Sequence, residues 1–154
     1  MLVRTSRFGE VTVEDSAAIS FPEGIVGFPE ATAFVMFDGP EGTPFKWLQS
    51  TVRPELAFVV CDPALFKGDY RVAATREDLA ALGLERVEDA AVCAILSVPA
   101  DPWQMTANLL GPLVFNVGRK VGKQLVLSGP EYTARHPVFP GGRPARLGAP
   151  GSGG

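Results

Sequence analysis

The stretch "MTANLLGPLVFNVGRKVGKQLVL", Met105 to Leu127, decides the fold of this chain. Two apolar runs flank the basic turn "GRKVGK" (Gly118–Lys123), and this pattern predicts a β-hairpin. The runs are interrupted by four polar residues, Thr106, Asn108, Asn116 and Gln124. A buried amide or hydroxyl without a partner costs roughly 1–3 kcal/mol, so each of these side chains should have a structural or a binding role.

Further strand patterns lie on the N-terminal side of this hairpin. They are apolar runs bounded by turn residues, at Gly9–Asp15, Ala33–Asp38, Phe45–Ser50, Leu56–Asp62, Asp69–Ala74 and Ala90–Pro99. One clear helix is expected at Thr75–Gly83, because Thr75 and Asp78 can form a capping box and Gly83 can end it. The sequence therefore predicts a mainly β, antiparallel, barrel-like single domain of roughly eight to ten strands with one or two short helices.

The folded domain is expected to span residues 1–139, followed by a flexible Pro/Gly-rich tail at 140–154. No apolar run approaches the length of about 18 residues that a membrane span needs, and the N-terminus lacks the pattern of a secretion signal. Cys61 and Cys93 each lie in an apolar run, which favours buried, reduced thiols, with a disulfide as the alternative. Together these features predict a cytoplasmic protein.

The net charge of −3 is unevenly distributed along the chain. Residues 8–61 carry eight acidic and two basic side chains, and residues 62–101 carry eight acidic and four basic ones, whereas residues 117–136 are basic with a net charge of +3. An acidic body with one basic strip is a poor nucleic-acid binder, because phosphate contacts supply most of that affinity. This distribution argues against an oligonucleotide-binding barrel and favours a protein partner.

Reactive groups that could form an active site are hard to find in this sequence. His136 is the single histidine, no zinc-ligand spacing is present, and Ser50 lacks the flanking glycines of a nucleophile elbow. The Gly118–Lys123 turn could hold an anion such as a flavin phosphate, although a solvated hairpin tip explains it as well. We therefore expect no enzyme activity, no metal, no cofactor and no small-molecule substrate.

Several separate segments occur in the order that is found in the flagellar assembly factor FliW family. They are "FPEGIVGFPE" (Phe21–Glu30), "FKWLQS" (Phe45–Ser50), "LAFVVCDP" (Leu56–Pro63), Tyr70, "TANLLGPLVFN" (Thr106–Asn116), "GKQLVL" (Gly122–Leu127) and "YTARHPV" (Tyr132–Val138). The chain resembles this family from about Phe8 to Val138. One departure is Gly111, which stands before Pro112 where the family pattern has alanine.

The resemblance implies a cytosolic, β-barrel-like protein without catalytic activity. Proteins similar to this one bind newly made flagellin near its C-terminal helical end, and they bind the translational repressor CsrA. Flagellin that awaits export occupies the factor, and its export frees the factor to capture CsrA and relieve repression. For flagellin the expected mode is an amphipathic helix against an apolar groove.

The candidate protein-binding residues are Trp47, Gln49, Asn108, Asn116 and Gln124, with a structural role as the alternative for each. A flavin-binding split barrel is the alternative function.

Overall fold

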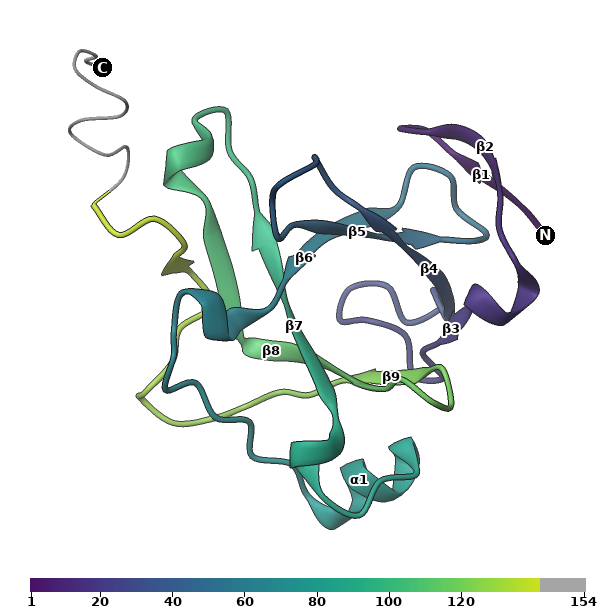
Figure 1. Ribbon diagram of the computed structural model, residues 1–154. Coiled ribbons are helices and arrows are strands. Elements are labelled where there is room, and N and C mark those ends of the chain that lie inside the picture. The colour runs from purple at the N-terminus through teal and green to yellow at the C-terminus, as the bar shows by residue number, and fades with distance from the viewer. Residues whose placement is uncertain (142–154) are drawn as a thin grey trace.

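The computed structural model describes residues 1–141 (Figure 1). The chain forms short strands that are joined by turns, loops and single-turn 3₁₀ helices. The strands are β1 (Leu2–Thr5), β2 (Gly9–Thr12), β3 (Ile19–Ser20), β4 (Ala33–Asp38), β5 (Lys46–Ser50), β6 (Ala57–Cys61), β7 (Ala91–Ser97), β8 (Thr106–Asn116), β9 (Val121–Gln124) and β10 (His136–Pro137). The helices are α1 (Arg76–Leu82) and the 3₁₀ turns η1 (Asp15–Ala17), η2 (Pro63–Leu65), η3 (Val87–Asp89) and η4 (Pro102–Gln104). The tail predicted from Pro140 lies, beyond Gly141, outside the described residues.

Seven strands, β3 to β9, close into a barrel, which confirms the predicted fold class. Around the ring the order is β8, β7, β6, β5, β4, β3, β9, and β9 pairs again with β8. One pair is parallel, Ser20 of β3 beside Val121 of β9, whereas the other pairs in the ring are antiparallel. An odd number of strands cannot alternate in direction all the way around a ring, so a closed barrel of this size requires a parallel pair.

The predicted hairpin within Met105–Leu127 is formed by β8 and β9, which pair from Leu113–Gln124 to Asn116–Val121. The predicted helix is also present. Thr75 and Asp78 form the capping box, and Gly83 ends α1 with a left-handed φ of 71°. Local sequence signals therefore determine both elements.

Two of the expected strands differ in the structure. The first ends at Thr12, because the chain turns there into η1. Residues 69–74 form no strand, and side-chain hydrogen bonds hold this segment instead. The Tyr70 hydroxyl donates to the Leu109 carbonyl at 2.6 Å, and the Tyr132 hydroxyl accepts from the Arg71 amide at 2.8 Å.

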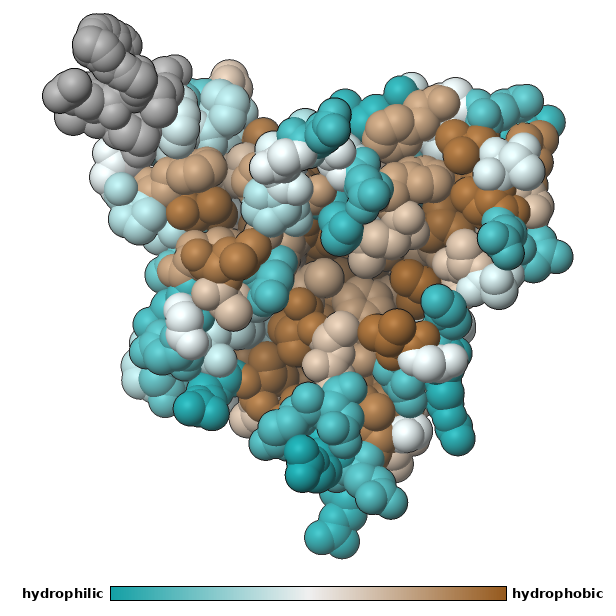
Figure 2. Space-filling model, viewed as in Figure 1, coloured by the Kyte–Doolittle hydropathy of each residue, from teal (hydrophilic) through white to brown (hydrophobic). Residues whose placement is uncertain are grey.

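The core of the barrel is filled by inward side chains and by the loop between β3 and β4. Phe21, Phe34, Leu48, Val60 and Leu113 are fully buried in one cluster. Ile25 and Ala31 from the loop join the same cluster, so this segment plugs one end of the barrel. Figure 2 shows hydrophobic residues at the centre of the opposite face, inside the ring of strands.

The N-terminal hairpin β1–β2 forms a separate two-stranded sheet beside the barrel. Its turn is anchored by the Ser6 amide, which donates to the Pro54 carbonyl at 2.8 Å. The Phe8 ring in this turn packs edge-on against Phe37 and Trp47, with ring centroids 5.4 and 6.0 Å apart. The hairpin thus covers part of the outer surface of β4 and β5.

Candidate protein-binding surface

An apolar groove of about 530 Å³ runs beside Trp47 on the outside of the barrel. Its walls come from the β1–β2 turn, the β4–β5 loop, the strands β5 to β7 and the start of β8. The lining residues are Arg7, Pro40, Phe45, Trp47, Ala57, Phe58, Val59, Leu96, Val98 and Met105. Val98 is 48% exposed and lies beside Leu96 and Met105 in this lining, so it adds to a contiguous apolar surface.

Trp47 is the one candidate residue that lines this groove. The Arg7 guanidinium lies 4.1 Å from the centroid of its indole ring, in a cation–π arrangement. The Phe8 ring meets the same indole edge-on. These two contacts fix the orientation of a half-buried tryptophan, which is the residue type that is enriched at the centre of protein interfaces.

Gln49 is fully buried, in contrast to Trp47. Its Nε2 lies 3.0–3.4 Å from the carbonyl oxygens of Ser50, Arg53, Pro54 and Leu56, so one amide holds the whole turn between β5 and β6. Its Oε1 accepts no hydrogen bond within the described part of the chain. The structure therefore places Gln49 within the fold, beneath the turn that anchors the β1–β2 hairpin.

Asn108 and Gln124 come together at a bend in β8. The Oδ1 of Asn108 accepts from the amides of Leu110 and Gly111, and this turn interrupts the pairing of β8 with β7. Gln124 crosses the bend, because its Nε2 donates to the Gly111 carbonyl at 3.0 Å and its Oε1 accepts from the Val26 amide at 2.7 Å. The two amides thus connect the bend to the loop that plugs the barrel.

The space at Gly111 explains what the departure from the family pattern does locally. A Cβ at this position would lie 2.8 Å from the Gln124 Nε2 and 3.1 Å from the Asn108 Nδ2. An alanine would therefore require both amide groups to shift slightly, whereas glycine lets them approach the backbone.

Asn116 lies at the other end of β8 and joins the hairpin to α1. Its Nδ2 donates to the Leu82 carbonyl at 2.8 Å, which satisfies one of the unpaired carbonyls at the end of the helix. Its Oδ1 accepts from the Arg119 amide in the β8–β9 turn. Of the five candidates, only Asn108 and Gln124 therefore share a site, and Trp47, Gln49 and Asn116 lie at three other places.

Sequence reasoning missed the other residues of the groove, above all Arg7, Val98 and Met105. They come from segments that are up to 98 residues apart in the chain, and no periodicity or motif connects them. The one usable signal was the alternating pattern of "FKWLQS", which places the groove residues Phe45 and Trp47 on the same side of the strand.

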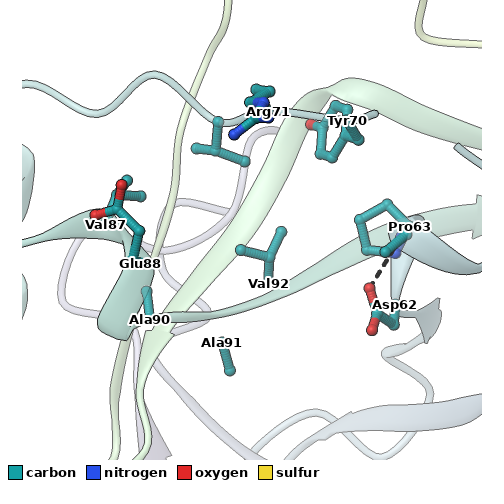
Figure 3. A pocket seen from close by; sticks show the side chains of 11 residues that line it. Asp62, Pro63, Tyr70, Arg71, Val87, Glu88, Ala90, Ala91 and Val92 are labelled. Carbon is teal, nitrogen blue, oxygen red and sulfur yellow. Dashed lines mark hydrogen bonds between the residues drawn. The ribbon is translucent and has the colours of Figure 1, made fainter. Parts of the chain in front are cut away.

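A second hollow, of about 490 Å³, lies between η2, η3 and β7 (Figure 3). Asp62 and Glu88 stand at opposite ends of it, with Ala90 and Val92 between them, so the two carboxylates are not paired in this hollow as acid–base catalysis would require. Asp62 instead caps η2, because its carboxylate accepts from the Ala64 amide at 2.9 Å.

The thiols of the described chain are free, as predicted, and burial raises the pKa of Cys61 and raises that of Cys93 to about 11. Both thiols are therefore protonated near neutral pH. Within residues 1–141, no three histidine, cysteine or acidic side chains come together as metal ligands, and none of the helices is long and apolar enough to cross a membrane.

A model of the FliW protein family matches residues 2–138 of the chain. The chain belongs to the FliW family. The flagellar assembly factor FliW of Geobacter sulfurreducens is 42% identical over 151 residues, which cover 98% of this chain and 93% of that protein. FliW of Natranaerobius thermophilus is 39% identical over 140 residues, which cover 90% of this chain and 93% of that protein.

The comparison of structures agrees with the comparison of sequences. A crystal structure of the flagellar assembly factor FliW superposes with a TM-score of 0.84 at 32% identity, and it covers 91% of this chain and 98% of the other. These FliW relatives are named for flagellar assembly, and none of these names refers to a flavin.

Proposed function

We propose that this FliW-family protein acts in the cytoplasm as a binding protein without enzyme activity. In this proposal it binds flagellin before export and, when flagellin is absent, binds CsrA and relieves the repression of flagellin translation. The observation that carries the proposal is the family match over residues 2–138, and the apolar groove beside Trp47 supports it as a surface for a protein partner.

The groove fits the expected mode of flagellin binding. An amphipathic helix buries one apolar stripe, and a groove with exposed valine and half-buried tryptophan can cover such a stripe. In the proposal Trp47 contacts the partner directly. Gln49, Asn108, Asn116 and Gln124 contribute by fixing the turns and bends that shape the partner surface.

The first experiment mixes the purified protein with flagellin and with CsrA and follows complexes by size-exclusion chromatography. A complex with each partner is expected, and the absence of both complexes would overturn the proposed function.

The groove is tested separately with Val98→Glu, which places a charge in it, and with Trp47→Ala. Each should weaken flagellin binding about tenfold or more, because a truncated interface tryptophan costs about 2 kcal/mol. Val126→Glu is the matched control, since Val126 is 77% exposed and lines neither the groove nor the mouth of the barrel. Unchanged flagellin binding by Val98→Glu and Trp47→Ala would reject the groove and leave the function standing.

The acidic body provides a reason why bound CsrA should release RNA. Residues 8–101 carry a net charge of −10, which repels phosphate near the complex even without covering the RNA site. Glu14, Glu41 and Glu77 are exposed acids, and reversing all three to lysine should reduce RNA displacement from CsrA at low salt but not at about 0.5 M salt, where charges are screened.

RNA release can be followed by fluorescence anisotropy of a labelled RNA, with CsrA binding measured alongside in the absence of RNA. Equal displacement by the wild type and the triple variant at low salt would contradict the electrostatic explanation.

A further inference from the structure

A second site, distinct from the groove, lies in the mouth of the barrel. The β3–β4 loop plugs one end, and at the other end the inward side chains leave a hollow of about 260 Å³. This end is the hydrophobic centre of the face in Figure 2. The hollow is lined by Ile19, Met36, Lys46, Ala91, Cys93, Phe115, Asn116, Val117 and Lys120.

The interior of this hollow is apolar and its rim is basic. Ile19, Met36 and Cys93 pack against the main core cluster, and Phe115 belongs to it. Lys46 and Lys120 are exposed at the opening. Lys46 already donates to the Asp38 carboxylate at 2.7 Å, whereas Lys120 makes no ion pair with any residue in the 1–141 range. Lys120 is therefore the cation that is available to a ligand.

The Lys120 backbone supports a fixed position for this cation. It has a φ of 56°, a conformation that non-glycine residues rarely adopt. Its carbonyl accepts from the Ser20 amide at 2.9 Å, the bond that helps close the barrel. The base of the side chain is thus held at the rim of the hollow.

We propose that the barrel mouth binds a small amphiphilic carboxylate, with its alkyl chain beside Ile19, Met36 and Phe115 and its carboxylate at Lys120. Mouths of small barrels commonly hold a single ligand of this kind, apolar within and polar at the opening. The hollow is slightly smaller than the roughly 300–1,000 Å³ of sites for drug-sized ligands, so a free carboxylate of about six to ten carbons suits it better than a nucleotide or a flavin.

Cys93 lines the hollow and is half-buried, and burial raises the pKa of its thiol to about 11. It also provides a reporter. In a Cys61→Ala background, Cys93 is the single thiol of the chain, and a ligand in the hollow should protect it from a small alkylating reagent.

The test uses the full chain with hexanoate, octanoate and decanoate, followed by titration calorimetry and by the rate of Cys93 alkylation. Binding should tighten about fourfold with each added methylene until the hollow is full, because each buried methylene contributes the same transfer free energy. Protection of Cys93 should follow the same affinities.

Two variants separate the apolar from the charged part of the site. Lys120→Gln should weaken the binding of octanoate about two- to fivefold. It should leave the binding of octanol unchanged, since octanol has no charge. Ala91→Phe should abolish the binding of both ligands, because Ala91 is an exposed lining residue whose enlargement closes the opening. Circular dichroism spectra check that both variants are folded.

Three results would overturn the proposal: no carboxylate protects Cys93, binding is unchanged by Ala91→Phe, or affinity is independent of chain length. Protection of Cys93 by a purified protein partner alone, and by no carboxylate, would likewise overturn it and assign the hollow to a partner side chain. None of these results bears on flagellin or CsrA binding at the groove.

Discussion

At the scale of single residues, most of the candidate amides act on the backbone of their own chain. Gln49 contacts four carbonyl groups, Asn108 stabilises a bend, and Asn116 caps the last turn of α1. The sequence showed that these polar groups need partners. It could not show which partners, because the contacts of Asn116 and Gln124 reach 34 and 98 residues along the chain.

Gln49→Met tests the role of the buried amide. The methionine has a similar shape but donates no hydrogen bond, so four carbonyls lose their shared donor and the free energy of unfolding should fall by about 1–3 kcal/mol. Urea unfolding measures this as a lower midpoint with an unchanged slope. Gln104→Met is the control, because Gln104 is exposed and should change stability by less than about 0.5 kcal/mol. Equal effects of the two substitutions would contradict the structural role.

At the scale of elements, local patterns predicted the β8–β9 hairpin and α1 correctly, because turn and capping residues lie within a few positions of each other. The prediction of a strand at Asp69–Ala74 was wrong: this segment pairs with no strand among residues 1–141, and the hydrogen bonds of the Tyr70 and Tyr132 hydroxyls hold it instead. Strand β1 was not anticipated at all. The groove could not be predicted from the sequence either, because its lining residues come from segments that are far apart in the chain.

The β3–β4 loop depends on glycines that differ in their surroundings. Gly24 has a φ of 71°, and a Cβ there would lie 2.5 Å from the Pro29 carbonyl oxygen. Gly27 has a φ of 89° with nothing within 4 Å of a Cβ. Gly27→Ala should therefore lower the free energy of unfolding by about 1–2 kcal/mol, from backbone strain alone. Gly24→Ala should lower it by about 1–3 kcal/mol more, because the new Cβ would also overlap the Pro29 carbonyl oxygen. Thermal unfolding of the two variants measures this difference in stability. Equal losses of stability would show that the backbone around Gly24 shifts to make room for the Cβ.

The packing of α1 on β9 includes an ion pair that makes stability depend on pH. Lys123 donates to Asp78 at 2.8 Å, which lowers the pKa of Asp78 and raises that of Lys123. The contribution of Asp78 to the free energy of unfolding is fully present when the pH is above the ordinary carboxyl pKa of about 3.9. It is lost as the pH falls through the lowered pKa of Asp78 in the folded protein. The contribution of Lys123 to the free energy of unfolding is lost as the pH rises through the raised pKa of Lys123.

Asp78→Asn keeps an oxygen for the capping box but removes the charge. It should lower the free energy of unfolding by up to about 1 kcal/mol at pH 7, and this difference should shrink as the pH falls below the ordinary carboxyl pKa of about 3.9 and through the lowered pKa of Asp78. Glu85→Gln at an exposed position is the control. Urea titrations at pH 7 and at a pH below the lowered pKa of Asp78 decide the question, and a difference that stays constant between them would rule out the ion pair as its source.

At the scale of the whole molecule, the barrel is closed by its weakest junction. Strands β3 and β9 share one residue pair, whereas β7 and β8 pair along most of their length. The Ser20 amide should therefore exchange its hydrogen through a local opening, at least tenfold faster than the slowest amides of β5 and β6. Hydrogen exchange followed by NMR measures both sets, and exchange of Ser20 with the slowest group would mean that the ring opens only on global unfolding.

The same junction has a consequence for synthesis on the ribosome. Strand β3 is made early in the chain and its partner β9 nearly last, so the ring cannot close until Gln124 has left the exit tunnel. Until then the nascent sheet has two open edges, one on β3 and one on the strand that formed most recently, and open edges of this kind recruit other strands. The period between the emergence of Ser20 and the emergence of Gln124 from the exit tunnel is therefore when this protein most needs protection by a chaperone.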